Sequence, residues 1–174
     1  IKNTLLSNMG GFGRMRSGFK SFLRDFKKKN APYFDILIVV QDANCKGIQE
    51  IKNGLIKITN KITTAFNQNI IYAIPDPHIE RWYISDPEGF SRTIGINNMP
   101  VLPQNKCEKN FYKNILKAKL KEAGIFSLIG GQEYGEKIIN NMDLNNAMKN
   151  DNSFKLFIED LRSIFKKVQP GLVE

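Results

Sequence analysis

FDILIVVQDANCK, the stretch from Phe34 to Lys46, decides the fold class of this chain. Its run from Ile36 to Val40 is wholly apolar and rich in β-branched residues, which predicts a strand buried on both faces, as in a parallel sheet. Asp42 and Asn44 follow at the carboxyl end, where open α/β sheets place their ligands. Their oxygen atoms could hold a divalent cation such as Mg²⁺, or either residue could simply cap the next helix.

A long helix and a second strand follow this stretch. Apolar residues step by three or four between Ile48 and Phe66, which predicts a helix. The apolar run from Ile70 to Ile74 predicts a second short buried strand. Strand, helix and strand in this order form a βαβ unit, so both strands should end at the same edge of a parallel sheet.

The segment at that shared edge reads IPDPHIERWY, from Ile74 to Tyr83. Pro77 is placed to open a short helix with Asp76 as its cap. Glu80 would then point back toward Asp42. The alternative is that Glu80 is only a carboxylate in the first turn of a helix, where the helix dipole favours it.

Helices are also predicted before and after this unit. Phe19, Phe22, Leu23 and Phe26 share one face of a helix that begins near Ser17, with a basic outer side. Residues 94–106 are irregular, and the last third is helical, ending in an amphipathic helix capped by Ser153. We therefore expect one α/β domain over residues 1–174, with a βαβ core at 10–90 and a helical C-terminal part at 108–168.

The glycines between Gly10 and Gly18 do not form a nucleotide-binding motif. The spacing from Gly13 to Gly18 suits a phosphate-binding P-loop, but Phe19 stands where that motif needs lysine, and no strand precedes it. The dinucleotide pattern fails too, because Arg16 replaces its third glycine. We expect these glycines to form a mobile loop from which Arg14 and Arg16 can reach a phosphate.

The net charge of +9 is the strongest global clue to function. An excess of Lys and Arg suits a polyanionic partner, most often nucleic acid. The chain is also rich in Lys, Ile and Asn together, a combination that an AT-rich genome produces without selection for binding. Charge therefore favours nucleic acid, DNA or RNA, without identifying the site.

Cysteine and histidine are scarce, which excludes several classes of site. Cys45 and Cys107 lie in unrelated contexts and form no disulfide framework, so a reducing, cytoplasmic location is the default. His78 is the only histidine, which rules out zinc sites that need two. No apolar run reaches the roughly 20 residues that cross a bilayer, so no membrane is expected. The chain begins with Ile1, so an absent targeting signal carries little weight.

The order of these motifs resembles Toprim domains, which occur in topoisomerases, primases and nucleases of bacterial defence systems. The turn from Asp42 to Asn44 is similar to their Asp-x-Asp signature. The likeness is closest to a bacterial family of uncharacterised Toprim-like proteins often encoded beside ATPases, in which a Glu-x-Glu-x-Trp-Tyr-like segment and an Asp follow. Here the segment runs from His78 to Asp86. The resemblance as a whole covers the chain from about Gly10 to Phe165.

The resemblance implies a Toprim-like Rossmannoid parallel sheet flanked by helices, and metal-assisted phosphoryl transfer on nucleic acid. Asp42 would bind Mg²⁺ or Mn²⁺ directly, Asn44 would be an ancillary ligand, and Glu80 a second ligand or water orienter. An ATPase partner and a role in anti-phage defence would be expected, and the oligomeric state, including a homo-oligomer, stays open. The residues implied for nucleic-acid contact are Arg14, Arg16, Lys46, His78, Arg81 and Lys137.

Three departures keep a second hypothesis open. Asn44 replaces the second acid of the signature, His78 stands at an often acidic position, and no strand ending in Glu precedes Gly10. An amide in place of a carboxylate weakens a site for a hard cation. The protein is therefore expected to be either a metal-dependent nuclease or a catalytically inactive module that binds nucleic acid or regulates a partner. A weaker third possibility is a structural protein whose basic helices dock on an acidic surface.

Overall fold

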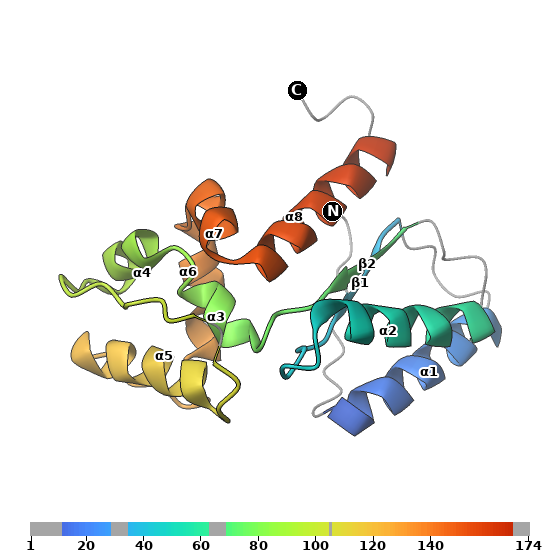
Figure 1. The fold of residues 1–174 in the computed structure, drawn as a ribbon, viewed down its shortest axis with the longest axis horizontal. Helices are drawn as coiled ribbons and strands as arrows, with labels where there is room; N and C mark the ends of the chain where they lie inside the picture. The colour runs from blue at the N-terminus through green and yellow to red at the C-terminus, as the bar shows by residue number, and fades with distance from the viewer. Residues whose placement is uncertain (1–11, 29–34, 63–68, 105, 169–174) are drawn as a thin grey trace.

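The computed structural model of this chain describes residues 12–28, 35–62, 69–104 and 106–168. It is an α/β protein in which a small parallel sheet is accompanied mostly by helices (Figure 1). The strands are β1 (Leu37–Val40) and β2 (Ile70–Ala73). The helices are α1 (Phe12–Lys28), α2 (Ile48–Ile62), α3 (Ile79–Tyr83), α4 (Pro87–Ile94), α5 (Phe111–Glu122), the 3-10 helix η1 (Gln132–Tyr134), α6 (Gly135–Asn140), α7 (Leu144–Asn150) and α8 (Asn152–Val168).

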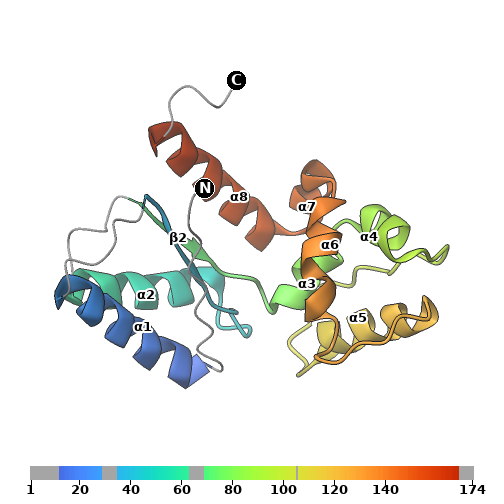
Figure 2. The same cartoon turned by 180° about the vertical axis from the view of Figure 1, so that it is seen from behind.

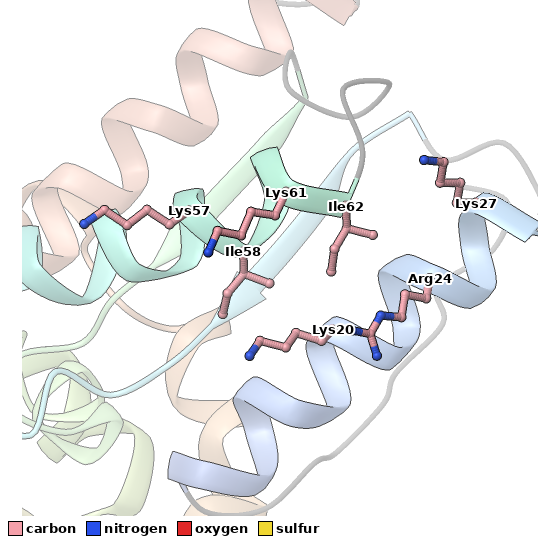
Figure 3. Close-up of a pocket in the computed structure, with 7 residues that line it drawn as sticks. All are labelled: Lys20, Arg24, Lys27, Lys57, Ile58, Lys61 and Ile62. Atoms are coloured by element: carbon pink, nitrogen blue, oxygen red, sulfur yellow. The ribbon is translucent and has the colours of Figure 1, made fainter.

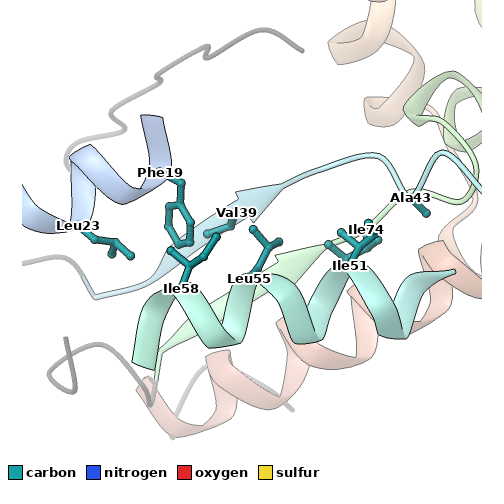
Figure 4. Close-up of a cluster of buried hydrophobic side chains, with 8 residues drawn as sticks. All are labelled: Phe19, Leu23, Val39, Ala43, Ile51, Leu55, Ile58 and Ile74. Carbon is teal, nitrogen blue, oxygen red and sulfur yellow. The ribbon is translucent and has the colours of Figure 1, made fainter. Parts of the chain in front are cut away.

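The predicted βαβ unit is confirmed. β1 pairs in parallel with β2, in a register that sets Leu37 opposite Ile70 and Val40 opposite Ala73. Helices α1 and α2 cover one face of this sheet (Figures 1 and 4). The first core cluster lies between them and is fully apolar: Phe19, Leu23, Val39, Ala43, Ile51, Leu55, Ile58 and Ile74.

The prediction that β1 is buried on both faces is wrong. Val39 points toward α2 and is 6 % exposed, whereas Ile38 and Val40 point to the other face and are 46 % and 51 % exposed. Helix α8 packs on that second face at β2, where Ala73 joins Phe154 and Ile158 in a cluster. An unbroken apolar run therefore did not require two covered faces here.

The remaining helices form a second lobe with its own core. Figures 1 and 2 show α3 to α7 gathered beside the βαβ lobe, with α8 lying across the junction. The core of this second lobe contains Ile84, Phe90, Ile94, Tyr112, Leu116, Leu120 and Ile138. Helix α4 therefore packs with the helical part, and not with the βαβ core of residues 10–90 that the sequence predicted.

Helix α8 is tied to the lobe junction by a buried polar network. The Asp151 carboxylate accepts the Phe154 backbone N–H at 2.9 Å, so Asp151, and not the predicted Ser153, caps this helix. The Ser153 hydroxyl instead accepts the Trp82 indole N–H at 2.7 Å. Trp82 also packs on Phe154 and Phe157, which anchors α3 against α8.

The glycine-rich segment differs from its prediction. Helix α1 begins at Phe12, so Gly13, Arg14 and Arg16 are helical and do not form a loop. The long apolar face that α1 presents to α2 outweighs the low helix propensity of its glycines. Gly10 and Gly11 lie outside the described residues, as does Phe66, the last residue of the helix predicted from Ile48.

The two cysteines form a disulfide that joins the lobes. The Cα atoms of Cys45 and Cys107 lie 5.7 Å apart, although 62 positions separate them in the chain. The expectation of two unrelated thiols is therefore wrong, and the cysteines no longer favour a reducing compartment. Within the described residues, no helix has the length and apolar character needed to span a membrane.

Candidate functional site

The segment after β1 continues along the segment after β2 and carries Asp42 to the lobe junction. The backbone N–H of Ala43 donates to Pro75 O at 2.8 Å, and that of Asn44 donates to Pro77 O at 3.0 Å. The Asp42 carboxylate then accepts the backbone N–H of Ile79, the first residue of α3, at 3.0 Å. Asp42 thus satisfies the amino end of a helix from the other lobe, and not that of the next helix in sequence.

This arrangement replaces the predicted cap of the short helix. The helix begins at Ile79, with His78 as a cap residue whose side chain makes no capping hydrogen bond. Pro77 and Asp76 therefore precede the helix, and do not open and cap it. The N–H group that a local cap would have satisfied is taken by Asp42 from a distant part of the chain.

Glu80 lies beside Asp42 at this carboxyl edge of the sheet. Its side chain is only 7 % exposed, and its carboxylate accepts the Gln132 side-chain N–H at 3.2 Å. Burial, followed by the negative charge of Glu80, raises the pKa of Asp42 to about 6, against the lowering influence of His78 and the Ile79 N–H. The structure thus brings together the two carboxylates that the sequence predicted to meet.

Tyr83 is a third member of the site that sequence reasoning missed. Burial, then the charges of Glu80 and Asp42, raises the pKa of its phenol. Its position three residues after Glu80 places both on one face of α3, a spacing that could have revealed it. Gln132 was also missed, and no local signal could have found it because η1 is more than 50 positions downstream.

Asn44 contributes less to the site than the resemblance implied. It is exposed and has a positive φ of 48°. Its side-chain amide N–H donates to the backbone carbonyl of Asp42 at 3.3 Å, which stabilises the turn. Asn44 therefore supports the loop that presents Asp42, and its observed hydrogen bond is to the backbone.

Two carboxylates are too few for a metal site made wholly of protein ligands, but they match the number that Mg²⁺ often takes from a protein. Across the described ranges, no group of three or more His, Cys, Asp or Glu side chains is arranged to hold a metal ion. A cage made wholly of protein ligands is thus not formed by these residues. Mg²⁺, however, keeps several waters and is often held by one or two carboxylates together with substrate phosphates. Asp42 and Glu80 fit that mode.

Arg81 is not placed to contact nucleic acid, contrary to the prediction. Its side chain is buried, and its Nε donates to the Asp151 carboxylate at 2.6 Å. The same guanidinium donates to Pro103 O at 2.7 Å and to the Tyr112 hydroxyl at 3.0 Å. With its donors used inside the protein, Arg81 holds the helical lobe together and cannot reach a phosphate.

The other residues expected to contact nucleic acid are dispersed. Arg14 and Lys137 are exposed on α1 and α6, in different lobes, and Lys46 is exposed in the turn after Asn44. His78 is partly buried between the charges of Asp42 and Asp76. Arg16 lies against α2, where a Cβ on Gly54 would come within 2.8 Å of its guanidinium. Only Lys46 and His78 are thus close in the chain to the carboxylate site.

No family model matches this chain, and neither a curated protein nor a solved structure matches it.

Proposed function

We propose that this protein is a metal-dependent phosphodiesterase that cuts nucleic acid at the Asp42–Glu80 site, on a Toprim-like fold. The observation that carries the proposal is the meeting of a partly buried carboxylate, Asp42, and a buried one, Glu80, at the carboxyl edge of a parallel sheet, the edge where α/β sheets place their ligands. The net charge of +9 supports a polyanionic substrate.

Each residue of the site has a separate task in this proposal. Asp42 and Glu80 would hold Mg²⁺ or Mn²⁺, which supplies charge stabilisation on the phosphate and a more acidic bound water. Burial disfavours the charged form of Asp42. A bound cation would oppose this influence and favour the ionised carboxylate. Gln132 orients the Glu80 carboxylate through its hydrogen bond, and the Ile79 N–H fixes that of Asp42. The Tyr83 phenol, which packs against Gly135 and feels the charges of both carboxylates, would support the site from the side of α6.

The test is cleavage of labelled DNA and RNA, single- and double-stranded, with Mg²⁺, with Mn²⁺ and with EDTA. Cleavage should require the metal and should fall at least a hundredfold in Asp42→Asn and in Glu80→Gln, since both charges would hold the ion. Asp35→Asn is the matched control, because Asp35 is an exposed carboxylate just before the same strand. Wild-type cleavage that persists in Asp42→Asn would exclude this site.

A second candidate function is a catalytically inactive nucleic-acid-binding or regulatory module. It is favoured by Asn44 in place of an acid and by the absence of a third acidic or histidine ligand among the described residues. Such a module would bind nucleic acid with a salt-dependent affinity that is the same with metal and with EDTA. Cleavage that depends on Asp42 would exclude it.

A further inference from the structure

Five of the seven described residues that line a hollow between α1 and α2 are cations. Its volume is about 450 Å³, and Figure 3 shows side chains from both helices bordering it. Lys20, Arg24 and Lys27 come from α1, at intervals that place them on one helix face. The opposite wall consists of Lys57 and Lys61 on α2, with Ile58 and Ile62 between the walls. We call the hollow that these five cations border the basic groove.

The cations of the basic groove have no acidic partners in the described part of the chain. The ion pairs found there are formed by other residues: Lys52–Asp160, Arg81–Asp151, Arg92–Glu88, Lys119–Glu122 and Lys155–Glu159. Like charges around one hollow repel each other, and an anion placed between them relieves that repulsion. The basic outer side of α1 is exposed, as the sequence predicted, and it also borders a second set of cations on α2.

The segments of the given sequence that lie outside the described ranges carry almost no acidic side chains. Residues 1–11, 29–34, 63–68 and 105 contain no Asp or Glu, and residues 169–174 contain only Glu174. These residues therefore supply at most one negative charge against five cations. A bound polyanion would supply the compensating charge.

We propose that the basic groove binds the phosphodiester backbone of a single nucleic-acid strand. This inference rests on the nucleic-acid part of the proposed function and adds a binding site separate from the Asp42–Glu80 pair. Lys57 and Lys61 lie about 14 to 20 Å along α2 from its amino end at Ile48, at a rise of about 1.5 Å per residue. A strand held there therefore continues for several nucleotides before it reaches the end of α2 that follows the Asp42 turn.

The shape and lining of the hollow favour a strand over other polyanions. Cations on two facing helices can surround a narrow backbone, whereas a lipid surface is flat and would meet only one wall. Among the described residues, the lining contains isoleucines and no aromatic ring, so contacts to phosphates, without base stacking, should dominate and give little sequence preference.

The test compares two triple variants of equal charge in the full-length protein. Arg24→Gln/Lys57→Gln/Lys61→Gln removes three groove cations, and Lys117→Gln/Lys121→Gln/Lys149→Gln removes three exposed lysines from α5 and α7. Both lower the net charge from +9 to +6. Binding of fluorescein-labelled oligothymidylate and oligouridylate is followed by anisotropy in EDTA over a series of KCl concentrations, so that no metal-dependent cleavage intervenes.

The groove variant should bind at least tenfold more weakly than the control variant. The slope of log affinity against log salt should be about −3.5 for wild type, since each contacted phosphate adds about −0.7 for a single strand, and about −1.4 for the groove variant. Equal losses in both variants would overturn the proposal, because net charge alone would then explain binding. Groove-dependent binding to phosphatidylglycerol vesicles, or to inorganic triphosphate as tightly as to the oligonucleotides, would also overturn it.

A measurement on the wild-type protein removes any dependence on the folding of the variants. Acetylation of lysines, read by mass spectrometry with and without oligonucleotide, should show protection of Lys20, Lys57 and Lys61 but not of Lys117 and Lys121. Unprotected groove lysines would overturn the proposal. Loss of cleavage only in Asp42→Asn, with groove binding intact, would separate the catalytic proposal from this one.

Discussion

The Asp42 carboxylate both stabilises the fold and carries an unfavourable charge. It accepts the Ile79 N–H and so fixes α3, yet its burial beside Glu80 raises its pKa to about 6. A charge held in such a position costs stability in the folded protein. Unfavourable charge of this kind concentrates at functional sites, which is why Asp42, and not the exposed lysines, is our strongest catalytic candidate.

Replacement of Asp42 by Asn should stabilise the protein at neutral pH. The folded-state pKa lies above the ordinary value of 3.8, so the folded state binds more protons between these values and stability falls as pH rises from about 4 to about 6. Asp42→Asn removes that loss and keeps an oxygen for the Ile79 N–H. The free energy of unfolding in urea should rise by on the order of 2 kcal/mol above about pH 6.5, with little change near pH 4. An equal effect at both pH values would contradict the raised pKa.

Removal of the Arg81 side chain should destabilise the protein. Arg81→Ala leaves the Asp151 carboxylate buried without its partner, and such losses cost about 3–5 kcal/mol in free energy of unfolding. Arg92→Ala is the matched control, because the Arg92–Glu88 pair is exposed and worth less than about 1 kcal/mol. Urea denaturation of both variants measures the difference. Similar losses in the two would show that the Arg81 network contributes little.

At the scale of elements, the turn between α5 and η1 presents three exposed apolar side chains on a fixed backbone. Phe126, Leu128 and Ile129 are 79 %, 82 % and 59 % exposed. The Glu133 carboxylate holds the turn by accepting the backbone N–H groups of Leu128 at 2.6 Å and Gly131 at 3.0 Å. One side chain therefore orders a loop that has little hydrophobic burial of its own.

Glu133→Gln should release this turn. Desolvation opposes the ionisation of Glu133, but hydrogen bonds from backbone N–H groups and Ser127 outweigh it and lower its pKa to about 2. The stabilising effect is thus complete above the ordinary value of 4.5 and is lost as pH falls through about 2. Amide exchange of Leu128 and Gly131 at neutral pH should accelerate several-fold in the variant. Glu136→Gln, at an exposed position on α6, should leave these rates unchanged.

At the scale of the whole molecule, two lobes meet around the carboxylate site. Asp42 comes from the βαβ lobe, whereas Glu80, Tyr83 and Gln132 come from the helical lobe. The Cys45–Cys107 disulfide and helix α8 both cross this junction. The relative position of the lobes therefore determines whether the two carboxylates can act together.

Cys45→Ser should destabilise the oxidised protein but not the reduced one. A disulfide stabilises mainly by restricting the unfolded chain, and a separation of 62 residues corresponds to about 4 kcal/mol in free energy of unfolding. Guanidinium denaturation with and without dithiothreitol measures this difference. Wild-type protein with dithiothreitol should match the variant. Identical curves for wild type and Cys45→Ser without reductant would show that the disulfide does not form in solution.

The sequence alone determined the local framework of the protein. Apolar runs and helical spacing predicted both strands, their parallel pairing and the long helix α2, because these depend on neighbouring residues within one element. The order of Asp42 and Glu80 after the two strands also predicted their meeting, since parallel strands end at one edge. These are consequences of local periodicity and simple topology.

Only the tertiary structure decided what each polar group contacts. Arg81 looked like a phosphate ligand until Asp151, 70 positions away, was placed against it. The cap of α3 came from Asp42 and not from adjacent Asp76, and Cys45 met Cys107 across the lobe junction. Burial and charge pairing are set by residues distant in the chain, and periodicity carries no information about them. The same reason explains why the basic groove emerged only when α1 was placed against α2.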